Sequence, residues 1–409
     1  MSTGQSAPVH DGLSSPLPDR PPLTDSRAHG RPGEVRSGGG RWRTGRQPAL
    51  GLAGLLLVVP IAVLLAVAAG GPERSVVVLA PLVTFALPPV VMIAFYWEDW
   101  PGTLLRPQWS GWLDTLLIAV AAVVLTIVGQ AVVGSVDLRG VFDPNPGPGH
   151  SAVFPAVMPL AGAAFVVMLQ ITFVNEGWPF RRLGRLGGGL AALAVALGIG
   201  LLIYALLVDF HPRPGSGLAA RSGPIPGAEL GAVLVAIGAW QVITFVVWRG
   251  WPFAGIHRRA VRLPAANATV LAAGVLTYVV AHGLGGLAPV VLNPTTGAVV
   301  AAGLVVGIQF EGALDRGQSP AAQRGEGLLV VLVIAAVLYT ALTLTANSLT
   351  WTDRLDPQEW VGHVALNALA VSVILHVAIG RRWPFQAKEC SATNADAAAS
   401  PAGDAATPS

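Results

Sequence analysis

The feature that most constrains this chain is a tryptophan–proline phrase that ends four long apolar runs. The phrase places a charged residue two positions before each tryptophan and a proline directly after it. Because the same phrase ends successive runs of similar length, it predicts a fold built from copies of one structural unit. The four tryptophans are Trp100, Trp178, Trp251 and Trp383.

The composition shows which solvent these runs require. Of the 409 residues, 53% are hydrophobic and only 11% are charged, whereas a soluble domain carries about 25% charged residues. Because so few charges cannot cover a water-facing surface, the composition predicts a membrane protein. The formal net charge of +3 does not indicate a nucleic-acid partner, since the basic residues lie in short loops and tails rather than on a folded basic domain.

The apolar runs predict an all-α polytopic membrane protein with ten transmembrane helices. Most runs approach or exceed the roughly 20 residues needed to cross a hydrocarbon core about 30 Å thick. Only helices or closed barrels satisfy the backbone polar groups in lipid, and runs this continuous are typical of helices. The ten runs are 49–70, 75–97, 112–134, 152–174, 186–208, 228–248, 265–287, 297–314, 327–349 and 361–380.

Two polar tails flank the transmembrane domain, which we place at 49–386. Residues 1–48 are rich in Pro, Gly, Ser and Arg, and residues 387–409 are rich in Ala, Ser and Asp. Neither tail has an apolar period, so both are expected to be disordered.

The arginines predict the orientation of the chain. Positively charged residues collect on the cytoplasmic side of a membrane, which places both termini and every Trp-Pro phrase in the cytoplasm. The arginine-rich composition is typical of GC-rich bacterial genes, so we expect the plasma membrane of a bacterium. If the N-terminus is inside, 20 of the 25 basic residues lie in inner segments, and the five in outer loops are Arg74, Arg139, Arg213, Arg221 and Arg354.

The spacing of the phrase predicts five tandem helix hairpins. Successive tryptophans are 78, 73 and 132 residues apart, and the last interval is twice 66. The missing copy is Phe310-Glu311-Gly312, which resembles the phrase without its Trp and Pro. Since all units run in–out–in, they are parallel repeats. The expected repeats span approximately 49–103, 104–183, 184–256, 263–316 and 327–386.

Each unit carries an ionisable residue two positions before the repeated tryptophan. A glutamate at a helix C-terminus is disfavoured by the helix dipole, whereas an arginine is favoured there. The three glutamates therefore suggest ion pairs with the two arginines, and the alternative hypothesis is a gate or polar vestibule at the cytoplasmic mouth. If it is a vestibule, Glu176→Gln should abolish activity without lowering membrane levels. The five residues are Glu98, Glu176, Arg249, Glu311 and Arg381.

Polar residues inside the runs form a candidate intramembrane site. His363 and Asn367 are four positions apart and share a helix face, while His376 lies deeper in the same run. Gln170 and Gln241 are expected to link helices by hydrogen bonds. Structural hydrogen bonding, a ligand site and catalysis all remain open for these five residues.

Two further patterns predict contacts of the helices. Trp prefers the headgroup level of a bilayer, so the four phrase tryptophans are expected to act as interfacial anchors. The arginines that follow them would lie against anionic lipid headgroups. Gly303 and Gly307 form a small-xxx-small pair, which predicts close helix contact.

The sequence favours a transporter- or channel-like bundle for a small or hydrophobic compound. The alternatives are a non-catalytic membrane scaffold or complex subunit and, less favoured, an intramembrane enzyme. No catalytic residue, metal site or cofactor is predicted, and the single cysteine, Cys390, excludes an intrachain disulfide. The bilayer is the expected partner, with an unidentified small-molecule ligand and a protein partner or homo-oligomer as further candidates.

Overall fold

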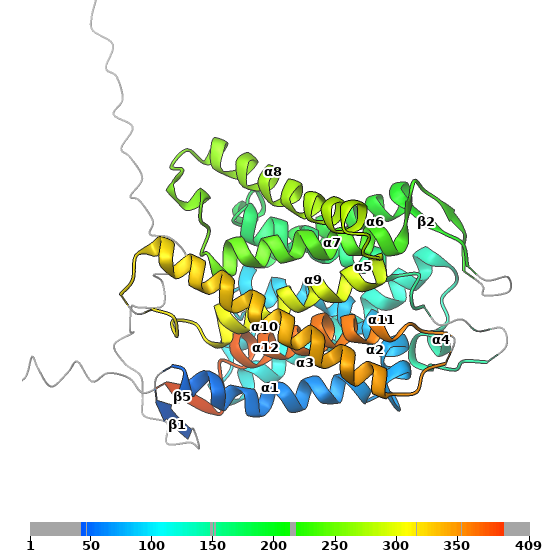
Figure 1. The fold of residues 1–409 in the computed structure, drawn as a ribbon, viewed down its shortest axis with the longest axis horizontal. Helices are drawn as coiled ribbons and strands as arrows, with labels where there is room; N and C mark the ends of the chain where they lie inside the picture. The colour runs from blue at the N-terminus through cyan, green and yellow to red at the C-terminus, as the bar shows by residue number, and fades with distance from the viewer. Residues whose placement is uncertain are drawn as a thin grey trace, which may run out of the picture. The chain divides into compact units, whose positions relative to one another are not determined.

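The chain is described by a computed structural model that covers residues 42–45, 47–147, 150, 153–212, 218–315, 317–352 and 354–387. The part described consists mainly of long helices that run side by side (Figure 1). Within it, nine helices are long and apolar enough to cross a membrane. A tenth apolar helix, Met158–Val174, is shorter. Most of residues 1–48 and 387–409 lies outside the described residues.

Ten helices divide by burial into an inner and an outer set. The inner set begins with α2 (Pro72–Val91), α5 (Met158–Leu169), α7 (Gly227–Val242) and α9 (Pro289–Leu304). Its fifth member, called the last inner helix below, runs from α11 (Pro357–Gly362) through η9 (His363–Leu369), α12 (Ala370–Ile374) and η10 (Leu375–Ile379). The outer set is α1 (Ala49–Val67), α3 (Pro107–Val133), α6 (Arg185–Leu207), α8 (Arg259–Tyr278, extended by η7, Val279–Leu284) and α10 (Pro320–Ser348).

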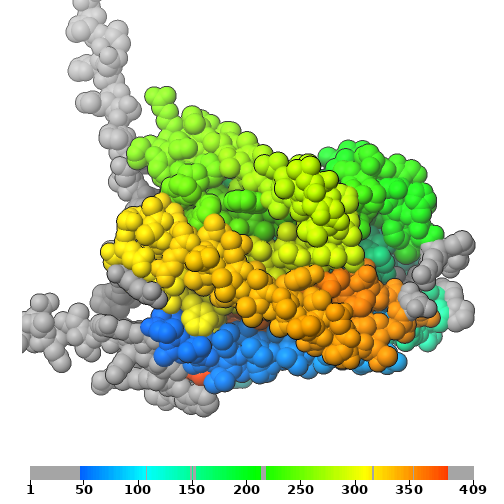
Figure 2. Space-filling model, in the orientation of Figure 1, coloured from blue at the N-terminus to red at the C-terminus, as the bar shows by residue number. Residues whose placement is uncertain are grey.

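The inner helices form a closed ring. Contacts join α2 to α5, α5 to α7, α7 to α9 and α9 to the last inner helix, which returns to α2. In the four inner helices of full spanning length, 61–78% of the apolar window is buried, against 17–33% in the outer helices. Large apolar side chains are exposed along the outer helices, for example Leu56, Leu116 and Val337. Figure 2 shows one face covered largely by outer helices α1, α8 and α10.

Each outer helix packs along the inner helix that precedes it in the chain. Thus α3 packs on α2, α6 on α5, α8 on α7 and α10 on α9, while α1 packs on the last inner helix and on α2. The expected repeats instead join each outer helix to the inner helix that follows it. The packed pairs are therefore offset by one helix from the expected repeats.

Every inner helix ends in the same wide turn. Its last five residues form η1 (Met92–Tyr96), η3 (Gln170–Val174), η5 (Ile243–Val247), η8 (Val305–Gln309) or η10. The next amide donates to the carbonyl five positions earlier, at 2.7–2.9 Å in all five copies. We call this end of the bundle the Trp-Pro end.

The second residue after the end of each inner helix takes a left-handed conformation in four copies. Its φ is 49–54° at Glu98, Glu176, Arg249 and Arg381, which is uncommon for residues other than glycine. In the remaining copy the left-handed residue is Gly312, with φ 79°. The phrase that recurs in the sequence therefore recurs as one local structure.

The residue whose amide closes each wide turn contacts an outer helix. Trp97 and Trp248 donate their indole N–H groups to the carbonyls of Arg185 in α6 and Arg324 in α10. Asn175 exchanges hydrogen bonds with Asn267 in α8.

In the other two copies a glycine of the outer helix allows the approach. A Cβ at Gly51 of α1 would lie 2.5 Å from the ring of Phe310, and one at Gly111 of α3 would lie 3.2 Å from Cα of Gly380. The five copies thus make the corresponding contact in four different ways.

The helix ends depart from the expected ones at several points. The eighth helix begins at Pro289 rather than at 297, since proline is favoured in the first helical turn. It ends before Glu311. The tenth helix likewise begins at Pro357 rather than at 361, and the third at Pro107 rather than at 112. The fourth begins at Met158, and residue 152 lies outside the described part.

Short elements close the two ends of the bundle. At the Trp-Pro end β1 (Trp42–Gly45) pairs in parallel with β5 (Phe385–Ala387), because α1 and the last inner helix are neighbours there (Figure 1). Residues 42–45 belong to the tail that was expected to be disordered, and the structure describes them as this strand. Four short helices lie in loops, and β2 (Val208–Phe210) pairs with β3 (Arg221–Ser222) and β4 (Ile225–Pro226) at the opposite end. The short helices are η2 (Gly102–Leu104), α4 (Leu138–Phe142), η4 (Phe180–Leu183) and η6 (Phe253–Gly255).

Candidate functional site

A cavity of about 330 Å³ lies inside the ring and is lined by all five inner helices. Most of its lining residues come from the first halves of these helices, counted to the end of the wide turn, so it lies toward the end opposite the Trp-Pro end. Phe154 and Phe210, which precede α5 and follow α6, also line it there. We call this space the ring cavity.

Most of the ring cavity wall is apolar, and glycines make room for it. Leu87, Phe165 and Leu234 supply apolar surface from α2, α5 and α7. A Cβ added at the lining residues Gly231 and Gly238 would meet no atom within 4 Å. The absence of side chains along this face of α7 therefore contributes directly to the open volume.

One side of the ring cavity is polar. It is formed by the last inner helix together with its neighbours α2 and α9. Because residues four apart share a helix face, the last inner helix presents its polar residues to the cavity from successive turns. The polar lining residues are Thr84, Asn293, Gln358, Glu359, His363 and Asn367.

His363 and Asn367 are held in a hydrogen-bonded chain. His363 Nε2 lies 3.2 Å from the carbonyl oxygen of Leu65 in α1, and its Nδ1 lies 3.4 Å from Asn367 Nδ2. Because a carbonyl only accepts, Nε2 carries the hydrogen and Nδ1 accepts. The Thr84 hydroxyl lies 3.2 Å from Asn367 Oδ1. The predicted pair is thus both cavity lining and a structural link between α1, α2 and the last inner helix.

Two acceptor groups of the cavity have no hydrogen-bond partner among the described residues. Asn293 Oδ1 and Gln358 Oε1 are buried and unpartnered. Glu359 stands beside Gln358 and lies four positions before His363. The sequence interpretation missed all three residues because it placed the starts of the eighth and tenth helices too late. The four-residue spacing of Glu359 and His363 was the available signal.

Gln170 and Gln241 lie in a separate amide cluster. Gln241 donates to Gln170 Oε1 and, at 3.1 Å, to the Val166 carbonyl. Gln170 donates to Asn267 Oδ1 at 2.8 Å, which links α7, the end of α5 and α8. This geometry is that of interhelical hydrogen bonding, as expected for these amides.

His376 lies in a third place, about 20 Å along the last inner helix from His363 at 1.5 Å per residue. Its ring stacks edge-on against Phe385 at 6.1 Å. A Cβ at Gly54 of α1 would lie 2.7 Å from His376 Nε2. The five residues of the candidate intramembrane site therefore occupy three sites, of which only the His363 site borders the ring cavity.

An apolar cluster separates the ring cavity from the Trp-Pro end. All five inner helices contribute buried side chains to it, and we call it the plug. Leu169 and Val300 line the cavity and also belong to the plug, so they form the cavity floor. Beyond them the plug contains, among others, Val91, Met168, Val242, Leu304 and Ile374.

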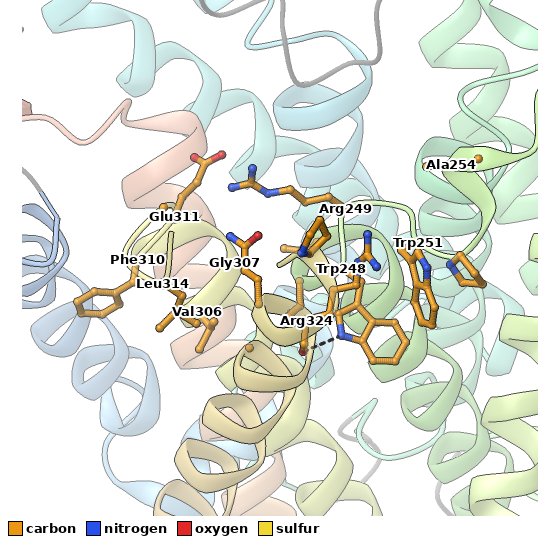
Figure 3. Close-up of a pocket in the computed structure, with 18 residues that line it drawn as sticks. Trp248, Arg249, Trp251, Ala254, Val306, Gly307, Phe310, Glu311, Leu314 and Arg324 are labelled. Atoms are coloured by element: carbon orange, nitrogen blue, oxygen red, sulfur yellow. Dashed lines mark hydrogen bonds between the residues drawn. The ribbon is translucent and has the colours of Figure 1, made fainter. Parts of the chain in front are cut away.

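A second pocket, of about 470 Å³, lies at the Trp-Pro end between α7, α9 and α10. Figure 3 shows Glu311 and Arg249 extending toward one another across it. The guanidinium of Arg324 lies 5.0 Å from the centre of the Trp251 ring. Trp248 stacks edge-on against Trp251 at 5.4 Å. This pocket combines charged and aromatic groups where the sequence suggested a vestibule.

The repeat-end charges have partners other than those expected. Glu176 pairs with Arg262 at 2.7 Å and with Arg259 at 3.7 Å, both from α8. Arg381 pairs with Asp99 at 3.4 Å. Glu98, Arg249 and Glu311 are exposed. Two of the five charges, Glu176 and Arg381, thus form local ion pairs with residues outside the set.

Three of the four phrase tryptophans are similarly exposed. Trp178, Trp251 and Trp383 are 45%, 43% and 44% exposed, whereas Trp100 is partly buried against Trp97. This exposure suits three interfacial anchors, and the anchor role itself stays a prediction.

Within the described residues no group of three or more His, Cys, Asp or Glu side chains is placed to hold a metal ion. The chain matches no protein-family model, no curated protein and no solved structure.

Proposed function

We propose that this protein is a transporter- or channel-like bundle that takes a small, mostly apolar compound into the ring cavity. The observation that carries the proposal is that one cavity is lined by all five inner helices. An apolar cavity with a few polar groups on one side is typical of a small-molecule site. The plug below it supplies a barrier that a transporter would have to open.

The proposal includes ten membrane-spanning helices in five repeated units. It is supported by the alternation of buried and exposed helices and by the wide turn that ends each inner helix. Met158–Val174 has 17 residues, at the lower limit of about 17–25 for a spanning helix. Because its neighbours in the ring are longer, we include it as a span.

We place the Trp-Pro end in the cytoplasm of a bacterial cell, with both termini inside. The excess of arginines in the inner segments supports this orientation. The exposed tryptophans and the arginines near them would then contact headgroups, with anionic lipids as partners. In this orientation the ring cavity faces the outside.

A non-catalytic scaffold is the second candidate, and the plug favours it. If the plug never opens, a compound in the ring cavity cannot cross to the other side of the membrane. An intramembrane enzyme has less support, because both ring nitrogens of His363 are engaged in hydrogen bonds.

Cysteine labelling separates these functions. In a Cys390→Ser background, Gly238→Cys places a thiol in the cavity without a clash, and Val242→Cys places one in the plug four residues later. An impermeant thiol reagent is applied to right-side-out or to inside-out vesicles. We expect Gly238→Cys to react from the outside quickly and from the inside slowly, because a transporter exposes its site to both sides.

Reaction from the outside alone would contradict transport and leave a one-sided binding protein. If Gly238→Cys reacts from neither side, the cavity is not accessible and the scaffold is favoured. Val242→Cys is the matched control, which we expect to react far more slowly than Gly238→Cys from the outside.

A further inference from the structure

The acceptor groups of the ring cavity point to the class of compound that it takes. This inference rests on the proposed function, since it requires that a small molecule enters the cavity. Hydrogen-bonding groups buried in native structures are almost always paired. Buried groups beside a cavity that have no partner in the protein therefore indicate which hydrogen-bonding groups a ligand would supply.

Some groups on the polar side of the cavity have hydrogen-bond partners, and others have none. Thr84, His363 and Asn367 bond to one another and to backbone carbonyls. Asn293 Oδ1 and Gln358 Oε1 are buried without a partner among the described residues. Both unpartnered atoms are carbonyl oxygens, which accept hydrogen bonds and cannot donate them.

The two side chains without a partner lie on neighbouring helices. Asn293 of α9 faces the first turns of the last inner helix, because a Cβ added at Gly362 would lie 3.8 Å from Asn293 Nδ2. Gln358 and Glu359 lie one turn before Gly362 on that helix and also line the cavity. Asn293, Gln358 and Glu359 thus line the same part of the wall.

Two acidic residues lie at this place. The lining residues include Glu359 but no lysine or arginine, within the part of the chain described. Asp356, whose side chain caps the start of α11, adds a second carboxylate close to Glu359. An anionic ligand would be repelled here, and a cation with N–H donors would be attracted.

We propose that the ring cavity binds a lipophilic amine, with its ammonium group at Asn293, Gln358 and Glu359 and its apolar body between α2, α5 and α7. A protonated amine supplies one positive charge and up to three donors, which suit a carboxylate such as that of Glu359. The apolar walls and the glycine-lined face of α7 accept a compact hydrocarbon group.

Three probes with one hydrocarbon cage test this proposal. The full chain in lipid nanodiscs is assayed by scintillation proximity with tritiated 1-adamantylamine at neutral pH, where the amine is protonated. Unlabelled 1-adamantanol and adamantane-1-carboxylate serve as neutral and anionic competitors. Because charge-assisted hydrogen bonds are stronger than neutral ones, we expect the amine to bind about tenfold more tightly than the alcohol or better. The carboxylate should compete least.

Glu359→Gln removes the charge and keeps the shape of the side chain. We expect this variant to lose the preference for amine over alcohol while the alcohol still binds. Glu229→Gln is the matched control, because Glu229 also lies in the first turn of an inner helix but accepts a hydrogen bond from Tyr278 instead of lining the cavity. The control should keep the preference.

The outcomes separate the ligand class from the proposed function. Equal binding of amine and alcohol, stronger binding of the carboxylate, or an unchanged preference in Glu359→Gln would overturn the amine assignment. So would failure of the amine to bind while Gly238→Cys is still labelled from outside. If no probe binds and Gly238→Cys is not labelled, the cavity is closed and the proposed function fails with it. Labelling of Gly238→Cys in the Glu359→Gln background shows that this variant has folded.

Discussion

The two halves of the inner ring pack in opposite ways. In the half that holds the ring cavity, α7 presents Gly231 and Gly238 to open space. One turn further on, Val242 of the same helix packs so closely on α9 that a Cβ at Gly303 would lie 2.6 Å from Val242 Cγ1. Along α7, glycine therefore borders the open space, and a branched side chain fills the core one turn later. We propose ligand binding in the first half and expect the second half to contribute more to stability.

The largest effect is expected in the plug. Leu304 is 6% exposed there, and its replacement by alanine should lower the free energy of unfolding by about 2–5 kcal/mol, because a buried leucine leaves a cavity. Leu329→Ala on α10, where the side chain is 62% exposed, is the control and should change stability much less. Thermal unfolding in detergent measures both. Equal losses would contradict the division of the ring.

Two glycine substitutions compare the halves directly. Gly303→Leu should be destabilising by about 1–3 kcal/mol or more, because the added side chain overpacks against Val242. Gly238→Leu should change stability by no more than about 1 kcal/mol, since its Cβ enters open space and glycine is a poor helix former. The same Gly238→Leu variant should lose binding of 1-adamantylamine. A stable Gly303→Leu protein would show that the plug is not close-packed.

A small effect is expected at the Trp-Pro end. Glu176 is 32% exposed in its pair with Arg262, so Glu176→Gln should cost about 0–1 kcal/mol, as for other partly exposed ion pairs. The rate at which Gly238→Cys is labelled should stay unchanged. A large change in that rate would support the vestibule hypothesis for Glu176. Residues at both ends of the bundle would then affect access to the ring cavity.

The sequence predicted those parts of the fold that follow from local composition. Among the described residues, the apolar runs located nine long helices and one shorter one, because lipid-spanning length is visible in a single run. Gly303 and Gly307 were expected to mark a close helix contact, and both face α7 valines. The phrase tryptophans located five similar helix ends, including the copy that lacks both Trp and Pro.

The parts that were missed depend on long-range packing. The pairing of each outer helix with the preceding inner helix cannot be derived from a repeat period, because a period does not fix the phase of a unit. Glu176 was expected to pair with Arg249 or Arg381, but Arg262 of α8 approaches more closely once α8 packs beside the end of α5.

The proposed binding groups were missed for a local reason. Asn293 and Glu359 lie near the starts of their helices, before the apolar runs that mark them, and short polar stretches such as 293–296 and 356–359 resemble loops in a sequence.

Closure of the ring is the central claim, and one cross-link tests it most directly. Thr84 of α2 and Asn367 of the last inner helix are 283 positions apart, yet their side chains meet at 3.2 Å. Thr84→Cys with Asn367→Cys, in the Cys390→Ser background and with a protease site inserted after α9, should form a disulfide in membranes that holds the two cleaved fragments together. The control pair of Thr84→Cys with Leu329→Cys, on the exposed face of α10, should not. Fragments that separate in the first pair as readily as in the control would show that the ring is open and would contradict the account.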